Sequence, residues 1–174
     1  METINNKLSD YTSSFFNNLK EYLDTKLYFY GSILRHDYFY GQSDIDVDIF
    51  TDNESSIISK MSMFLHIPTR QFDKIIWRSP ITNHLIHGYK VMYYDKTDTS
   101  LKVEFSIYNE KNKTEVLKVH LSKSKLPFYA TSLLWILKIL FYYLQLISIE
   151  NYRFFKSKTL SLIIGIPEID FIKI

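Results

Sequence analysis

The sequence contains no cysteine, so a disulfide framework, a thiol nucleophile and a cysteine-ligated zinc site are all excluded. Glycine and proline are scarce, with four of each among 174 residues, and this composition argues against a disordered or fibrous chain. The net charge of +2 is too small to attract nucleic acid over the whole surface. Nothing in the composition points to an oxidising compartment, and we expect a cytoplasmic protein.

Long hydrophobic runs are also few. The N-terminal residues METINNKLSD lack the apolar core of a signal peptide. Residues 126–149 are mostly apolar and about long enough to cross a bilayer, but Lys138 lies near the centre of this run. We therefore expect this run to form a helix of a protein that has no membrane partner. The alternative is a helix that spans a membrane.

Apolar and aromatic residues are abundant, at 46% and 17%, which is enough for a sizeable core in one domain. Spacings of three and four predict helices at residues 8–23, 53–65 and 127–146, followed by a short helical tail. Aromatic or alternating runs predict strands at residues 26–30, 43–50, 89–94 and 101–108. The last two strands are expected to form an antiparallel hairpin, and the lysine-rich residues 110–125 favour no single element.

Acidic and apolar residues alternate in the segment SDIDVDIF at residues 43–50. In a strand this period of two places Asp44, Asp46 and Asp48 on one face and the apolar residues on the other. Carboxylates side by side repel one another, so we expect a cation such as Mg²⁺ among them. The alternative is a solvated outer face of an edge strand, where acids discourage aggregation.

A glycine and a serine precede this acidic strand. Gly31 and Ser32 follow the strand at 26–30, and eleven residues separate Ser32 from Asp44. We expect the run SILRHDYF to open a helix, whose N-terminus and Ser32 hydroxyl can donate hydrogen bonds to a phosphate. The glycine would let that phosphate approach the backbone closely. The sequence thus predicts a phosphate site beside the acids.

The run from Tyr30 to Phe50, YGSILRHDYFYGQSDIDVDIF, resembles the motif of the nucleotidyltransferase superfamily. That superfamily includes DNA polymerase beta, poly(A) polymerases, oligoadenylate synthetases and antitoxin-type transferases. The resemblance covers residues 26–108 and 126–146. It implies an α+β fold with a short mixed sheet, a catalytic core at residues 1–125 and a C-terminal helical appendage at residues 126–174.

The resemblance also implies a metal site. Asp44 and Asp46 would hold Mg²⁺ or Mn²⁺ and serve as catalytic carboxylates. Glu104, on the strand at 101–108, would be the third carboxylate at a position where the family more often has aspartate. Asp48 is expected to be a second-shell or surface acid.

The nucleotide would be held by Gly31 and Ser32, according to the same resemblance. Lys138 lies in the run LLWILK, which is similar to a run whose lysine reaches the triphosphate in poly(A)-polymerase-like and oligoadenylate-synthetase-like members. An unpaired buried ammonium is costly, and a phosphate would compensate for it.

The implied reaction moves a nucleoside monophosphate from a triphosphate such as ATP to a hydroxyl and releases pyrophosphate. We expect an RNA 3′ end as the acceptor. A protein hydroxyl, or a non-catalytic regulatory or binding subunit with the same fold, is the alternative. Only 66 residues follow Tyr108, so a partner subunit or a second copy is expected to supply the acceptor platform.

Overall fold

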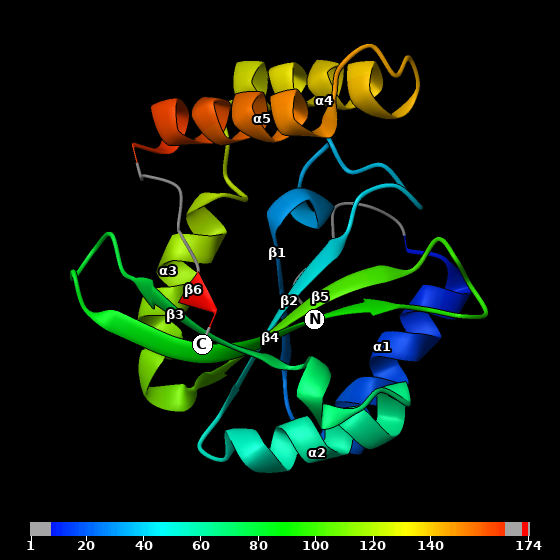
Figure 1. Ribbon diagram of the computed structural model, residues 1–174, viewed down its shortest axis with the longest axis vertical. Helices are drawn as coiled ribbons and strands as arrows, with labels where there is room; N and C mark the ends of the chain where they lie inside the picture. Colours follow the sequence, from blue (N-terminus) through cyan, green and yellow to red (C-terminus); the bar gives the residue numbers. More distant parts are fainter. Residues whose placement is uncertain (1–7, 166–171, 174) are drawn as a thin grey trace.

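A six-stranded mixed sheet forms the centre of the computed structural model, which describes residues 8–165 and 172–173 (Figure 1). Its strands are β1 (Leu27–Tyr30), β2 (Ile45–Thr51), β3 (Asp73–Arg78), β4 (Leu85–Tyr94), β5 (Lys102–Asn109) and β6 (Ile172–Lys173). Their order across the sheet is β1-β2-β5-β4-β3-β6. Strands β2 and β5 run parallel, and the other neighbouring strands are antiparallel.

The helices are α1 (Asp10–Leu23), α2 (Glu54–Leu65), α3 (Lys113–Ser122), α4 (Phe128–Tyr142) and α5 (Ile149–Ile164). Two of them begin where the sequence predicts. Ser9 Oγ accepts a hydrogen bond from the Thr12 amide at 3.1 Å, and Asn53 Oδ1 accepts one from the Ser56 amide at 3.0 Å. These side chains bind backbone N–H groups that the first turn of a helix leaves without a partner.

The two faces of the sheet pack differently. Helices α1 and α2 cover one face, where Val47 and Phe105 are fully buried together with residues such as Phe16. On the other face α3 covers only part of the sheet, packing Val116 and Val119 into a smaller cluster. Helices α4 and α5 lie beyond this partly covered face, at the top of Figure 1. Since side chains alternate along a strand, the polar positions of β2 and β5 point toward α3, α4 and α5.

The expected hairpin is confirmed, because β4 and β5 pair in antiparallel register from Tyr94 opposite Lys102 to Gly88 opposite Tyr108. Strand β4 begins at Leu85, earlier than predicted, and β3 was missed altogether. The ambiguous segment at residues 110–125 contains α3. Strand β6 comes from the predicted appendage and pairs with β3 of the core.

The predicted helix after Gly31 is wrong. A single turn of 3-10 helix covers Gly31–Leu34, and Arg35 is extended, with φ −121° and ψ 168°. Arg35 instead directs its guanidinium to the carboxylate of Asp37 two residues later, inside the protein. A helix through both residues would remove this local pairing, which is buried and charge-assisted.

The apolar run at residues 126–149 forms a shorter helix than predicted. Helix α4 ends at Tyr142, and Gln145 adopts a left-handed backbone with φ 51° before α5 begins. Helix α5 is a full element of 16 residues rather than a short tail. Across the part of the chain that is described, we find no helix with the length and apolar character needed to cross a membrane.

Candidate active site

The three carboxylates predicted to act together lie on one face of adjacent strands. The parallel register of β2 and β5 places Asp46 opposite Glu104. Asp44 precedes β2, two residues before Asp46, and both line the same cavity. Val103 and Phe105, which flank Glu104 in the sequence, are fully buried on the opposite face. The predicted alternation along both strands is therefore confirmed, and it gathers acidic groups at one place.

Burial and mutual repulsion oppose ionisation of these acids. Desolvation, followed by the charge of Glu104, raises the pKa of Asp46 to about 7. The same two causes raise the pKa of Asp44. The positive charge of Lys156 on α5 acts in the opposite direction on both carboxyls. The balance still disfavours the ionised forms, so an additional cation would stabilise this cluster.

Glu104 already has a positive neighbour. Lys90 Nζ, on β4, lies 2.7 Å from Glu104 Oε1. As the side chains stand in the described residues, no three acidic or imidazole groups are close enough together to hold a metal ion. The donor set nevertheless fits Mg²⁺ or Mn²⁺, because Asp44, Asp46 and Glu104 offer carboxylate oxygens and Asp46 is destabilised in its charged form.

Gly31 brings the end of β1 close to the acids. Its φ of +74° lies in the left-handed region that favours glycine, and a Cβ at this position would overlap Asp46 Oδ2. Its amide donates to Ser124 Oγ at 3.0 Å, whereas the sequence analysis expected a phosphate there. Glycine is therefore required to make room for the Asp46 carboxylate. The neighbouring Ser32 lines the cavity beside Asp46.

Lys138 has an internal partner, which corrects the view of it as an unpaired ammonium awaiting a phosphate. Its Nζ donates to the Asp37 carbonyl at 2.6 Å and to Ser43 Oγ at 3.1 Å, and lies 3.2 Å from Asp37 Oδ2. Arg35 donates to both oxygens of the same carboxylate, at 2.6 and 3.0 Å. Burial lowers the pKa of Lys138 to about 8, although Asp37 opposes this shift. Lys138 thus contributes to the wall of the cavity through a buried ion pair.

Asp48 differs from the two acids before it. It is fully buried, and its Oδ2 lies 2.7 Å from Nδ1 of His120 on α3. The imidazole ring stacks on Tyr30 and Trp77, with centroid separations of 4.2 and 6.1 Å. Of the two positions expected for Asp48, the surface is therefore wrong, and a place behind the other two acids stays a prediction. The carboxylate instead fixes the orientation of a histidine ring in the interior.

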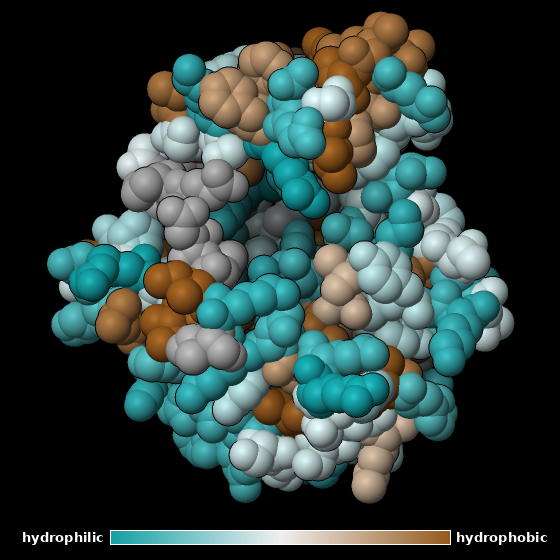
Figure 2. All heavy atoms as spheres, viewed as in Figure 1, coloured by the Kyte–Doolittle hydropathy of each residue, from teal (hydrophilic) through white to brown (hydrophobic). Residues whose placement is uncertain are grey.

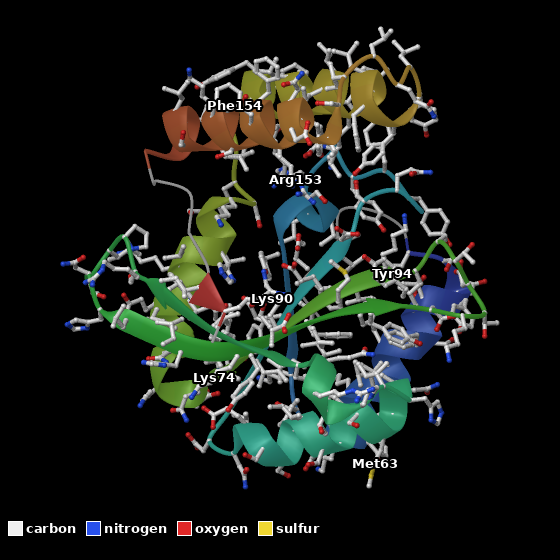
Figure 3. The ribbon with its side chains drawn as sticks, in the orientation of Figure 1. Met63, Lys74, Lys90, Tyr94, Arg153 and Phe154 are labelled. Atoms are coloured by element: carbon white, nitrogen blue, oxygen red, sulfur yellow. The ribbon has the colours of Figure 1, made fainter. Side chains whose placement is uncertain are left out.

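A cavity of about 240 Å³ opens between the acids and α5, beneath the helix in Figure 2. Carboxylates, hydroxyls, cations and aromatic rings all line this cavity. The lining residues include Asp44, Asp46, Ser32, Phe141, Tyr142, Tyr152, Arg153 and Lys156. Figure 3 shows Arg153 on the side of α5 that faces the sheet, with Phe154 on the opposite side. These groups offer hydroxyls and cations that can bind phosphates and aromatic rings that can pack against a base.

A second cavity, of about 200 Å³, lies on the Glu104 side of Asp46. It is richer in positive charge, because Lys90, Lys123 and Lys156 all line it. His120 also reaches its wall. Asp46 and Lys156 belong to both cavities, so a ligand in either one would meet the same carboxylate and ammonium.

Strand β4 and helices α3 and α5 bring residues to the site that were not predicted from the sequence. These residues are Lys90, His120, Arg153 and Lys156. One pattern in the sequence could have indicated Lys90. Side chains alternate along a strand, so Lys90 lies on the opposite face of its strand from Tyr89. Arg153 and Lys156 are three apart and share one helix face, but the shortened prediction for α5 concealed this pattern. His120 carried no signal, because its segment favoured no single element.

A mixed sheet that presents carboxylates from two parallel strands beside a glycine-serine turn is the arrangement expected of a nucleotidyl-transfer domain. Residues 12–128 match the family model described as the nucleotidyltransferase domain, so the chain belongs to this family. The predicted α+β fold, with flanking and C-terminal helices, is confirmed. Comparison with curated protein sequences gave no match.

The chain also matches several solved structures. A structure of Cid1 poly(U) polymerase matches 76% of this chain at 15% identity and a TM-score of 0.41. A cytoplasmic RNA terminal U-transferase matches 76% at 16% identity and a TM-score of 0.44. The chain spans 41% of the length of each of these proteins. A Cid1 structure with MgGTP bound also matches 76% of the chain, at 16% identity and a TM-score of 0.41.

Proposed function

We propose that this protein is an active, metal-dependent nucleotidyltransferase that moves a nucleoside monophosphate from a triphosphate to a hydroxyl and releases pyrophosphate. The observation that carries the proposal is the pairing of Asp46 with Glu104 across parallel strands, beside Asp44 and above a cavity that Ser32 also lines. Burial and the charge of Glu104 raise the pKa of both aspartates, and a bound cation would relieve this destabilisation of their charged forms.

We place the nucleotide in the cavity of about 240 Å³. Phe141, Tyr142 and Tyr152 offer ring surfaces on which a base can pack. Lys156 offers positive charge and Ser32 offers a hydroxyl, so the phosphates would bind beside these two residues and the acids. This orientation puts the α-phosphate next to Asp44 and Asp46.

The carboxylates of Asp44, Asp46 and Glu104 would hold Mg²⁺ or Mn²⁺, which supplies activation of the acceptor hydroxyl and neutralises charge on the leaving pyrophosphate. Asp46 would serve as a ligand in its deprotonated form. Its raised pKa disfavours that form in the metal-free protein, and a bound cation would favour it. Glu104 would have to turn from Lys90 Nζ toward the ion, and Lys90 would still line the second cavity. Glu104 is also the acid placed to accept the proton of the acceptor hydroxyl.

An RNA 3′ end is the acceptor that we propose. Its support is the second cavity, where Lys90, Lys123 and Lys156 can meet the phosphates of a nucleic-acid backbone beside Glu104. The runner-up is a hydroxyl of a protein, which would use this cavity without needing its positive charge.

The test is transfer of label from each α-labelled nucleoside triphosphate, with Mg²⁺ or Mn²⁺, to either RNA oligonucleotides or total protein. The proposal expects lengthened RNA together with released pyrophosphate. Label on protein alone would favour the runner-up. No pyrophosphate with any triphosphate, metal or acceptor would identify a non-catalytic subunit.

A further inference from the structure

Helix α4 leaves a wide apolar face in water. The face continues past the end of the helix into the turn before α5, where Figure 2 shows hydrophobic atoms gathered at the top of the molecule. Its members are large apolar or aromatic side chains that are 46–82% exposed: Phe128, Tyr129, Leu133, Trp135, Ile136, Tyr143, Leu144 and Leu146. We call this set the α4 face.

The α4 face is large compared with what an isolated domain normally exposes. Side chains of this size, about half exposed or more, each present on the order of 100 Å², so the set presents about 800 Å². The largest apolar patch of a typical monomer is about 300–600 Å². A stable interface between two proteins buries about 800 Å² on each partner. The α4 face by itself therefore matches one side of a standard interface.

The charge pattern of α4 suits contact with an identical surface. Lys138 is the charged residue within Phe128–Tyr142, and it points inward to Asp37. A twofold contact brings equivalent regions of two chains together, so any charge on the face would meet its own copy. The α4 face carries none, which makes it compatible with itself. It also offers nothing to attract a strongly charged partner.

The shape of the α4 face points the same way. Phe128 projects at one end and is 82% exposed, and beside it lies a cavity of about 340 Å³ lined by Trp135, Ile136 and Thr131 among others. The midpoint between Phe128 and Tyr143 falls near Ile136. A twofold axis there would pack the Phe128 end of one helix against the Tyr143 end of the other.

We propose that this protein forms a homodimer in which the α4 faces of two copies pack antiparallel around a twofold axis near Ile136. Each copy would then bury the apolar surface that α4 leaves exposed, and α4 and α5 of both copies would form a four-helix layer. The residues of the α4 face line neither of the two cavities beside the acids, so the dimer leaves these cavities open. The inference does not depend on the proposed function.

Sedimentation velocity at micromolar concentrations tests the dimer directly. The wild type is expected to sediment as a dimer, and the double substitution Leu133→Glu and Ile136→Glu is expected to weaken association at least about 100-fold, because it buries like charges at the axis. Met63→Glu is the matched control, since Met63 is 69% exposed on α2 at the opposite end of the molecule (Figure 3). This control should remain dimeric.

The absence of cysteine allows a second test that does not rely on disrupting the surface. Ile136→Cys creates a single thiol, and two such thiols near a twofold axis should join readily with a short bismaleimide crosslinker. Met63→Cys should give no crosslinked dimer. A monomeric wild type, a dimer that persists in the double variant, or a monomer that instead sediments with lipid vesicles would each overturn the proposal.

Discussion

Two groups of charged residues lie on the same side of the sheet, and they are built in opposite ways. In the Arg35–Asp37–Lys138 cluster, one carboxylate receives hydrogen bonds from Arg35 and an ion pair from Lys138, and all three residues are buried. In the Asp44–Asp46–Glu104 cluster, three acids share cations that face them from β4 and α5. We call the first cluster balanced because each of its charges has a partner of opposite sign, although its two cations exceed its one carboxylate. In the second cluster three carboxylates face the two cations Lys90 and Lys156.

Their pKa values express this difference. Burial opposes ionisation of Asp37, yet the hydrogen bonds from Arg35 and the charge of Lys138 lower its pKa overall. Burial also acts on Asp46, but there Glu104 adds to it and the pKa rises to about 7. A buried charge that has its partners stabilises the fold, and a group of charges without enough partners is suited to a ligand.

The largest expected effect comes from neutralising the acid cluster. Replacing Asp44 and Asp46 with asparagine should lower triphosphate turnover by more than about 100-fold, because even residues that merely orient metal ligands typically contribute 10–100-fold. The melting temperature should stay the same or rise, since the carboxylate repulsion is relieved. Pyrophosphate release and thermal unfolding measure the two effects. Unchanged turnover would remove both acids from the site.

The balanced cluster should respond in the reverse manner. Asp37→Ala leaves two buried cations without their carboxylate and should lower the free energy of unfolding by about 3–5 kcal/mol. Lys138→Met should cost less, because Arg35 still binds Asp37. Chemical denaturation measures both changes. Glu110→Ala is the control, since its ion pair with Lys113 is partly exposed and should contribute about 0–1 kcal/mol.

Substitution of Glu104 tests whether this residue acts in turnover and not in triphosphate binding. Glu104→Gln should lower kcat about 10–100-fold while changing triphosphate affinity little, because Glu104 acts on the acceptor side. Lys90→Gln removes the same ion pair but keeps the carboxylate, so it should lower kcat much less. Steady-state kinetics and triphosphate titrations separate the effects. A wild-type kcat in the Glu104→Gln variant would contradict a role of Glu104 on the acceptor side.

The stability of the metal-free protein is also expected to depend on pH. With a pKa near 7 in the folded protein and about 4 in the unfolded chain, Asp46 binds a proton in the folded state that the unfolded state has lost. Stability of the metal-free protein should therefore fall as pH rises from about 4 to about 7. Asp46→Asn should flatten this slope in a series of thermal melts. Equal slopes in the two proteins would show that Asp46 titrates normally.

The acid cluster was largely predictable, while the balanced cluster was not. The alternation in β2 and in β5 is a local pattern, and each one fixes a face independently of the rest of the chain. Lys138 and Asp37 are 101 positions apart, and only tertiary packing brings them together. Arg35 was assigned to a helix for the same reason, because its preference for Asp37 depends on a buried environment that no local pattern reveals.

The same distinction explains the cavity walls. The alternation predicted for β2 and β5 placed Asp46 and Glu104 on polar strand faces, and the parallel register of the two strands brings these residues opposite each other. The helix that faces them, α5, was predicted only as a short tail. An apolar run with one central lysine favours a single long helix by its periodicity, whereas Gln145 in a left-handed conformation divides it into α4 and α5. Because the start of α5 was not predicted, Arg153 and Lys156 of this helix were not assigned to the site.

The central claim is that the unbalanced carboxylates hold the cations that nucleotidyl transfer requires. Titration of Mn²⁺ into the protein with a nucleoside triphosphate, followed by electron paramagnetic resonance of the free ion, measures this without relying on catalysis. The account predicts that the wild type depletes free Mn²⁺ beyond what the triphosphate alone binds, and that the protein with asparagine at positions 44 and 46 does not. Equal depletion by the two proteins would contradict it.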